Sequence, residues 1–257
     1  MLLPAQDGDK VSVPFSDPSR PGTVRVELMH GDITVRTHSG KDVLVDMAGA
    51  RAATSRTRTS RRTPAEVEGL KRIDVSGSRM DVEERENVIR VNSGVSQGNV
   101  TVTVPQNTSL KLKTLTGTVD VEGVRGEVEA NSLKGAVRIT NTEGSVVAHS
   151  LNGKVIVSLN RVTPDKAMAF STMNGDIDVT MPADTKARLR LKNDHGEVWS
   201  DFEMKLESTP KVETTAKAAD GKYKVKFERM VTGTINGGGP EMSFTTLNGQ
   251  IRIRQKK

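Results

Sequence analysis

GTVDVEGVRGEVEANSLKGAVRITNTEGSVVAHSLNG, the stretch from residue 117 to residue 153, has a glycine at every ninth position. Between these glycines the apolar residues recur with gaps of two, three and four, as in Val119, Val121 and Val124. Two apolar residues separated by one polar residue predict a short strand, and a glycine predicts the sharp turn after it. The stretch therefore predicts short strands joined by tight corners.

The same pattern returns at 22–35, 110–121, 168–179 and 242–253, and more weakly at 189–198. Every second unit carries a hydroxyl and then a large apolar residue before its corner, as in Ser132-Leu133, so that one full coil takes about 18 residues. We expect these hydroxyls to hydrogen-bond backbone groups that strand pairing leaves free. Structural turns are expected at Gly117, Gly126, Gly135, Gly144, Gly153, Gly175 and Gly249.

Strands this close together leave no room for crossover helices, so the pattern predicts an all-β fold, a single parallel β-solenoid. Each coil adds a rung of ~4.8 Å and buries its apolar residues against the rungs above and below. Asp120 and Arg138 are one coil apart and are expected to pair on the outside. Hexapeptide helices repeat every six residues, and calcium β-rolls need paired glycines and a calcium-binding Asp, so neither fits and no calcium is expected.

The composition agrees with a narrow core. The chain has 257 residues, 3% aromatic residues, a single Trp, a single Tyr and no Cys. Burial must therefore come from Val, Ile, Leu, Met and Ala. The absence of Cys excludes disulfides, thiolate catalysis and zinc sites with Cys ligands.

Most of the net charge of +6 lies in one segment. Between residues 47 and 64 there is no Asp or Glu, and the five arginines there are Arg51, Arg56, Arg58, Arg61 and Arg62. A DNA-binding domain spreads its positive charge over a folded face, so no specific nucleic acid is expected as a partner. We expect the five arginines to bind anionic envelope polymers, with affinity that falls as salt rises. A solvated insertion without a ligand is the alternative.

We divide the chain into a polar lead-in, 1–22, and one solenoid, 23–257, with insertions near 48–68 and 203–222. The second insertion is expected to form a loop or a short helix. The segment 69–105 alternates but loses the nine-residue spacing, which predicts irregular coils or hairpins.

The two chain ends lead to further expectations. The last strand alternates Ile251 and Ile253 with basic residues, which are expected to discourage end-to-end stacking at the end of the solenoid. These basic residues are Arg252, Arg254, Lys256 and Lys257. No apolar run reaches the ~18 residues of a transmembrane span, and the apolar start at 1–5 is too short for the core of a signal peptide.

Four segments, SLNGKVIV, STMNGDIDVTMPADT, HGEVWSDF and INGGGPEMSFTTLNGQIRIR, together resemble the bacterial putative-adhesin family of β-strand-repeat proteins, a domain of unknown function. The likeness covers roughly residues 23 to 257, and its most specific part is Gly-Gly-Gly-Pro followed by a Leu-Asn-Gly strand. The resemblance implies a right-handed solenoid in an extracytoplasmic setting, the periplasm or the cell surface, often behind a signal peptide. The family has no assigned catalytic residues, so none are carried over.

Metal and phosphate sites find little support in the residues. The four histidines, His30, His38, His149 and His195, form no H-x-x-x-H or H-E-x-x-H pattern, so no metal is expected. Gly237–Pro240 leads into a strand rather than a helix, which favours a corner over a phosphate loop.

An enzyme acting on polysaccharides would need converging carboxylates and aromatic platforms. Asp176 and Asp178 stand two apart and form a possible pair on one side of a strand, although solvated surface acids are the simpler interpretation. Trp199 and Tyr223 alone make poor platforms for sugar rings. No enzyme activity and no cofactor are expected.

The sequence thus leads to a non-enzymatic envelope solenoid that serves as a scaffold or an adhesion surface, with an anionic polymer or another envelope protein as its partner. Two alternatives stay open. One is a polymerising filament protein of the bactofilin type, whose ends stack. The other is a polysaccharide-active β-helix enzyme.

Overall fold

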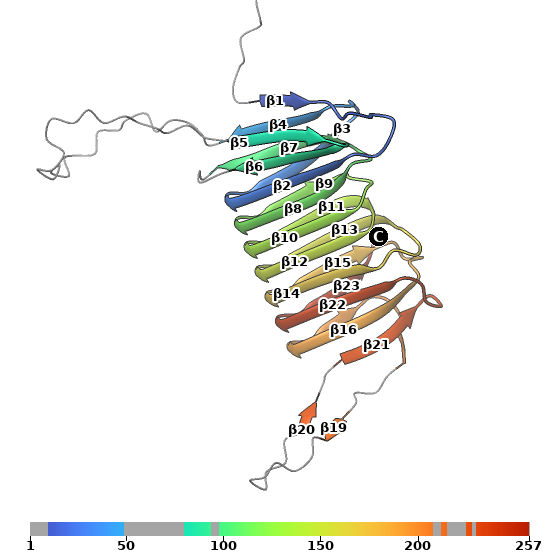
Figure 1. The fold of residues 1–257 in the computed structure, drawn as a ribbon. Helices are drawn as coiled ribbons and strands as arrows, with labels where there is room; N and C mark the ends of the chain where they lie inside the picture. The colour runs from blue at the N-terminus through green and yellow to red at the C-terminus, as the bar shows by residue number, and fades with distance from the viewer. Residues whose placement is uncertain are drawn as a thin grey trace, which may run out of the picture.

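The computed structural model describes residues 10–48, 80–93, 98–207, 212–214, 225–227 and 230–256. Strands are the only regular secondary structure in these residues (Figure 1), which confirms the all-β prediction. A search of the same residues for a helix long and apolar enough to cross a membrane finds none. The strands form two large sheets, called sheet A and sheet B, and one small hairpin.

The strands of both sheets are given in spatial order. Sheet A contains β1 (Lys10–Val13), β4 (Val43–Ala48), β7 (Asn99–Pro105), β3 (Ile33–His38), β9 (Val119–Glu122), β11 (Val137–Gly144), β13 (Val155–Val162), β15 (Ile177–Met181), β23 (Ile251–Gln255) and β17 (Val198–Ser200). Sheet B contains β18 (Lys205–Leu206), β21 (Met230–Ile235), β16 (Ala187–His195), β22 (Glu241–Asn248), β14 (Met168–Asn174), β12 (Val146–Asn152), β10 (Val128–Lys134), β8 (Ser109–Thr116), β2 (Thr23–His30), β6 (Val88–Ser93) and β5 (Met80–Arg85). The hairpin pairs β19 (Val212–Thr214) with β20 (Val225–Phe227).

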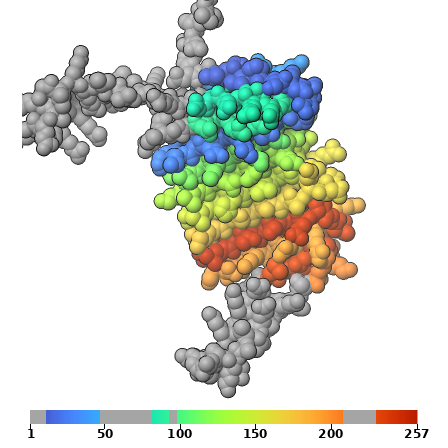
Figure 2. Space-filling view, viewed as in Figure 1, coloured from blue at the N-terminus to red at the C-terminus, as the bar shows by residue number. Residues whose placement is uncertain are grey.

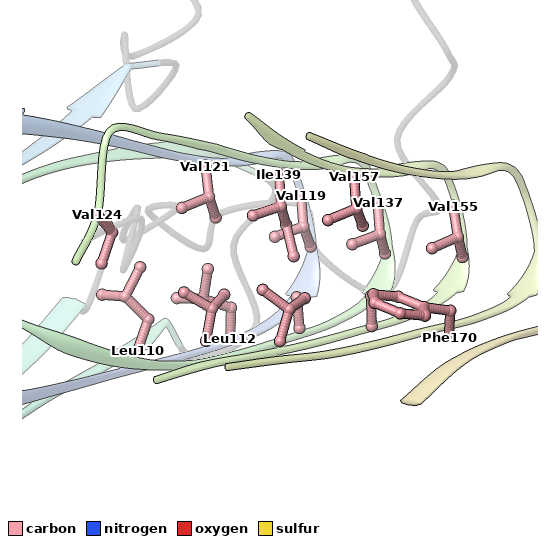
Figure 3. Close-up of a cluster of buried hydrophobic side chains, with 14 of the residues drawn as sticks. Leu110, Leu112, Val119, Val121, Val124, Val137, Ile139, Val155, Val157 and Phe170 are labelled. Carbon is pink, nitrogen blue, oxygen red and sulfur yellow. The ribbon is translucent and has the colours of Figure 1, made fainter. Parts of the chain in front are cut away.

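Each coil gives one strand to each sheet, and the central strands of both sheets stack in parallel (Figure 1). Val128 of β10 pairs with Leu110 of β8 on one side and with Val146 of β12 on the other, equally far before and after it in the sequence. The inward side chains of the two sheets face each other across a narrow apolar core (Figure 3). Phe170 and Phe244 are the largest fully buried side chains, and their ring centroids lie 5.0 Å apart. The chain is thus a solenoid-like stack of coils.

One glycine per coil stands at the corner that leads from a sheet B strand to the next sheet A strand. At Gly135 φ is +152°, and a Cβ there would lie 2.0 Å from the carbonyl oxygen of Gly117 in the preceding coil. The N–H of Gly135 donates to the carbonyl of Asn152 in the following coil at 3.1 Å. The same close approach runs through a glycine column made of Gly98, Gly31, Gly117, Gly135, Gly153, Gly175, Gly249 and Gly196. Only glycine fits this corner, because the backbones of neighbouring coils touch there.

Buried hydroxyls line the inside of the same corner. Ser150 is fully buried, and its hydroxyl donates to the carbonyl oxygen of Gly135 at 2.9 Å. The same bond is made by Thr114, Ser132, Thr172 and Thr246. In the β16–β17 coil, Asn193 takes this place and donates to Gly249 at 3.1 Å. The hydrogen bonding expected of these hydroxyls is confirmed.

The large apolar residue that follows each hydroxyl lies outside the core, contrary to our expectation. In β10 the buried residues are Val128, Ala130 and Ser132, so the next residue, Leu133, points outward and is 43% exposed. The strand keeps its two-residue alternation up to the corner, and successive side chains of a strand point to opposite faces. In the sheet B strands the gap of three in the apolar pattern therefore marks a change of face, whereas Val124, which follows a sheet A strand, is buried.

The first and last coils of the chain lie inside the stack. The β2–β3 coil lies between β6–β7 and β8–β9, and the β22–β23 coil lies between β14–β15 and β16–β17. Figure 2 shows the last coil as a red band between gold and orange bands. The expectation that its basic residues guard a solenoid end is wrong. Arg254 instead pairs with Asp178 of β15 at 3.0 Å, and Arg252 with Asp176 at 3.5 Å.

Antiparallel strands close the stack at its two poles. At one pole β5 pairs with β6, and β4 and β1 extend sheet A beyond β7. At the other pole β21 and β18 extend sheet B beyond β16. The segment before residue 23 contributes to the fold, because it supplies β1 and the buried Phe15. The segment 69–105 supplies the β5–β6 hairpin and the parallel strand β7, and the described residues of 203–222 supply strands rather than a helix.

Candidate interaction surface

Charged residues on the outer side of sheet A form ion pairs between adjacent coils. Arg138 lies 3.6 Å from Asp120, which confirms the predicted pair. Arg36 pairs with Glu122 at 3.0 Å in the same way. These side chains are largely exposed, so each pair contributes only ~0–1 kcal/mol. Where the outer side of sheet A carries these charges, they are compensated by a neighbour in the next coil.

Sheet B differs, because three neighbouring strands share a run of outward residues without charge; the charged outward residue of β22, Glu241, lies at the start of that strand and pairs with Arg190 at 3.3 Å. In register across β12, β14 and β22, the outward residues form three rows. We call these residues the uncharged face: Val147, His149, Leu151, Ala169, Ser171, Met173, Ser243, Thr245 and Leu247. Charged residues flank it on both sides, Glu129 on β10 and Arg190 and Lys192 on β16. Of all residues in the chain, 27% are charged, so nine neighbouring surface residues without a charge distinguish this face from the surface around it.

One row of the uncharged face belongs to a longer apolar column. The residues that follow the buried hydroxyls stack from coil to coil as Leu115, Leu133, Leu151, Met173 and Leu247, and Met29, which follows the buried Leu28, continues the column beside Leu115. Met29 is 54% exposed and Met173 44%, and Val147 of the neighbouring row is 41% exposed. Continuous exposed apolar surface of this kind marks an interaction site in many proteins.

Side-chain hydrogen bonds hold the rim of this face in one arrangement. At the corner, Asn174 donates to the side-chain oxygen of Asn152 at 2.7 Å, and Asn248 donates to that of Asn174 at 2.8 Å. On the face itself, Nδ1 of His149 lies 2.7 Å from the hydroxyl of Ser171. The apolar column is thus presented on a fixed surface.

The two carboxylates considered for catalysis are held as structural ions. Asp176 accepts from the N–H of Gln250 at 3.1 Å and lies 3.4 Å from the ammonium of Lys154. The N–H of Gln250, followed by Lys154, lowers the pKa of Asp176 below its ordinary value despite partial burial. Asp178 is paired with Arg254. An ionised and paired carboxylate is suited to joining coils rather than to donating a proton.

The other residues singled out in the sequence fall in three places. The five arginines from Arg51 to Arg62, and also Tyr223, lie outside the described residues. Trp199 is 58% exposed on β17 at the edge of sheet A. In the part of the chain that the structure describes, no three His, Asp or Glu side chains are grouped to hold a metal ion. Gly237 and Gly238 form a turn with φ near +86° and +85° that leads into β22.

Sequence reasoning overlooked the uncharged face, although its signal is present in the sequence. Once the buried positions of β12, β14 and β22 are fixed, the residues between them are all uncharged. The sequence does not show that β22 lies beside β14, because residues 182–240 separate the β14–β15 coil from β22 in the chain.

Comparisons with known proteins show which family the chain belongs to and which solved structures resemble it. The sequence profile described as Toastrack DUF4097 matches residues 26–236. The chain belongs to the Toastrack DUF4097 family. Two solved structures are similar: one is described as a putative cell adhesion protein from Clostridium sporogenes, with 12% identity, a TM-score of 0.45, and coverage of 97% of this chain and 100% of the other. The second is described as a putative adhesin from Bacteroides fragilis, with 11% identity, a TM-score of 0.34 and full coverage of both chains, each 100%. No curated protein matches this Toastrack chain. The resemblance to a putative-adhesin family of unknown function is confirmed.

Proposed function

We propose that this Toastrack chain is a non-enzymatic scaffold of the bacterial cell envelope, in the periplasm or on the cell surface, whose uncharged face binds another envelope protein. The observation that carries the proposal is the uncharged face itself, three aligned strands with an exposed column of Leu and Met. A right-handed winding with coils of about 18 residues, as the repeat and the family resemblance predict, belongs to the same proposal.

The chemistry of the face favours a polypeptide as its occupant. Anionic polymers need cations, and the nine residues of this face carry none. Sugar rings are best held by aromatic platforms, and the face has no Trp, Tyr or Phe. Val, Leu and Met side chains instead match the apolar side chains at the centre of protein interfaces, where Met is enriched and charge is depleted.

The poles argue against a filament that grows by stacking coils. A filament that continued the rungs of the stack would have parallel strands at the free edges of both sheets. The edges of sheet B are the antiparallel strands β5 and β18, and one edge of sheet A is the antiparallel strand β1. An isolated scaffold that binds its partner sideways agrees better with this arrangement.

A photo-cross-linking amino acid tests the proposal in living cells. It is placed at Leu133, beside the uncharged face, and, as the matched control, at Thr140 on the outer side of sheet A in the same coil. We expect one discrete adduct with another protein from position 133 and none from position 140, and we expect Leu151→Lys to abolish it. The adduct protein is then purified, and its affinity is expected to fall at least about tenfold with Leu151→Lys, which corresponds to about 1.4 kcal/mol. Circular dichroism checks that the variant is folded.

Three results count against this function. The first is the same set of adducts from both positions, and the second is the absence of any adduct from position 133. The third is an adduct with a second copy of the chain, which would make the face a homodimer interface instead.

The arginine-rich segment forms a second part of the proposal, as a contact to anionic envelope polymers. Its support is the concentration of five cations without an acid between residues 47 and 64. Replacing all five arginines by Gln should weaken binding to teichoic acid or lipopolysaccharide, with the larger loss at low salt. Unchanged binding at two salt concentrations contradicts this part alone.

A further inference from the structure

A cavity of about 420 Å³ lies between the first coils and the segment that precedes β2. Its walls come from residues 15–22, from the turns 38–41 and 105–108, and from Arg125. These segments are far apart in the sequence, so the cavity exists only in the folded stack. We call it the basic pocket, for the charges given below.

The wall formed by residues 15–22 is fixed in place by the turn between β5 and β6. The N–H of Asp17 donates to the side-chain oxygen of Asn87 at 2.9 Å, and the amide of Asn87 donates back to the carbonyl of Arg20 at 3.3 Å. Asn87 is 7% exposed, and therefore its bonds are shielded from water. Phe15 packs so closely on Gly22 that a Cβ there would lie 2.2 Å from the ring. This wall is formed before any ligand arrives.

The turn 38–41 is fixed by the ring of His38. Its Nε2 lies 2.8 Å from the carbonyl oxygen of Asp42, and its Nδ1 accepts from the N–H of Gly40 at 3.3 Å. Both ring nitrogens therefore serve the turn that carries Lys41. His38 is a positioning residue for that ammonium.

The charged side chains that line the cavity are all basic. Three cations line it, Arg20, Lys41 and Arg125, and its described lining contains no Asp or Glu. Arg20 is held by Asp17 at 2.7 Å, and Arg125 lies 3.7 Å from Glu143. Lys41, by contrast, makes no ion pair with any described residue. Ser39, Gln106 and Asn107 add neutral hydrogen-bonding groups.

From this geometry we propose that the basic pocket binds the phosphate group of an organic phosphate about the size of a sugar phosphate. Cations from three separate segments suit a group that offers oxygens in several directions, and Arg and Lys are the usual phosphate ligands in proteins. The volume falls within the range of about 300–1,000 Å³ that is typical of small-molecule sites, which is more than a bare phosphate ion fills. The ligand is either a free sugar phosphate or a phosphate unit of an envelope polymer. The site is separate from the uncharged face, and neither proposal depends on the other.

Calorimetric titration of the full chain with glucose 6-phosphate tests the site. Glucose and inorganic phosphate are titrated in parallel. The pocket variant combines Lys41→Gln and Arg125→Gln, and the control variant combines Arg138→Gln and Lys154→Gln, which removes the same charge from the outer side of sheet A and its corner. We expect glucose 6-phosphate to bind with one site per chain, glucose not to bind, and the pocket variant to bind at least about tenfold more weakly. The control variant should stay within about twofold, because its cations are remote from the pocket.

Several outcomes overturn the proposal. These are the absence of saturable binding, equal binding of glucose, or an equal loss of affinity in the control variant, which would indicate a general charge effect. Thermal melting shows whether both variants remain folded, and all four positions are exposed enough for this to be expected. A competition with poly(glycerol phosphate) separates the two sources: displacement at a lower phosphate concentration identifies the polymer, and no displacement identifies the free sugar phosphate. Leu151→Lys on the uncharged face is expected to leave the titration unchanged.

Discussion

Each coil has two corners, and they differ in how much variation they allow. The glycine corner, from a sheet B strand to the next sheet A strand, has two residues between the strands in every coil except β6–β7, where five residues lie between them. The loop corner, on the return to sheet B, has between one and five residues in the coils from β9–β10 to β15–β16. The basic pocket and a second cavity of about 680 Å³ both lie at the loop corner. One corner thus fixes the stack, and the other is free to carry sites.

The physical reason is how regularly neighbouring backbones approach each other: at the glycine corner the close approach recurs in every coil, whereas at the loop corner the described residues show it at Gly126, Gly144 and Gly239. At the glycine corner the chains touch, and a buried hydroxyl of each coil bonds the glycine carbonyl of the coil before it. Any added atom must displace a backbone there. At the loop corner surface turns face solvent, where extra residues add only a small loop-closure entropy.

Insertion of Gly-Ser at each corner should give the largest difference. Between Lys134 and Gly135 the insertion is expected to cost on the order of 4 kcal/mol of unfolding free energy, because it breaks the contacts of two neighbouring coils. Between Asp165 and Lys166, at the loop corner, it should cost less than about 0.6 kcal/mol. Urea denaturation measures both values. Similar costs at the two positions would remove the distinction between the corners.

A single methyl group on the glycine column should have the next largest effect. Gly135→Ala is expected to cost about 3 kcal/mol, since its Cβ would lie 2.0 Å from the Gly117 oxygen at a φ of +152°. Gly237→Ala is the control: its φ is +86°, but no atom lies within 4 Å of the added carbon. Only the backbone strain of about 1 kcal/mol remains in the control. If both variants unfold at the same midpoint temperature, the close approach of the two backbones does not determine the cost of alanine at this position.

Removal of one corner hydroxyl should have a smaller effect. Ser150→Ala leaves the Gly135 carbonyl without its donor and is expected to cost about 1–2 kcal/mol. Ser243→Ala, on the half-buried outer side of β22, should cost less than about 0.5 kcal/mol. Denaturant midpoints compare the two. A stability of Ser150→Ala equal to that of the unmodified chain would mean that the hydroxyls only fill space.

The smallest effect is expected from charge at the glycine corner. Asp176 has a lowered pKa in the folded chain, so its carboxylate stabilises the fold at neutral pH and this contribution is lost as the pH falls below about 4. Asp176→Asn should lower stability at pH 7 by about 0.5–1 kcal/mol and flatten the acid limb of the stability curve. Asp165→Asn, at an exposed position of the loop corner, should leave that limb as it is. An unchanged acid limb in Asp176→Asn would contradict the structural role of this carboxylate.

The sequence predicted the glycine corner in considerable detail. The hydrogen bonds of Ser132 and Ser150 and the pair of Asp120 with Arg138 were all expected and are all present. These contacts join consecutive coils, whose spacing is visible in the chain. The outward position of Leu133 was missed, because apolar spacing does not show on which side of a strand a residue lies.

The loop corner was much less predictable. The basic pocket joins Phe15, Lys41 and Arg125, which no local pattern relates. The buried Phe15 and strand β1 belong to a segment that reads as a polar lead-in, since a single strand at an edge carries too short a pattern to be recognised.

The sequence by itself determined the strands, the corners and the kind of residue inside each coil, because these depend on contacts that repeat at a short and constant spacing. Only the tertiary structure decided the order of the coils. Thr246 bonds Gly175 by the same contact that Ser150 makes with Gly135, so the corner chemistry fits many coil pairs equally well. The β6–β7 coil stacks outside the first coil and the β16–β17 coil outside the last, so both of these coils lie one coil inside the stack. That order places β22 beside β14, which completes the uncharged face.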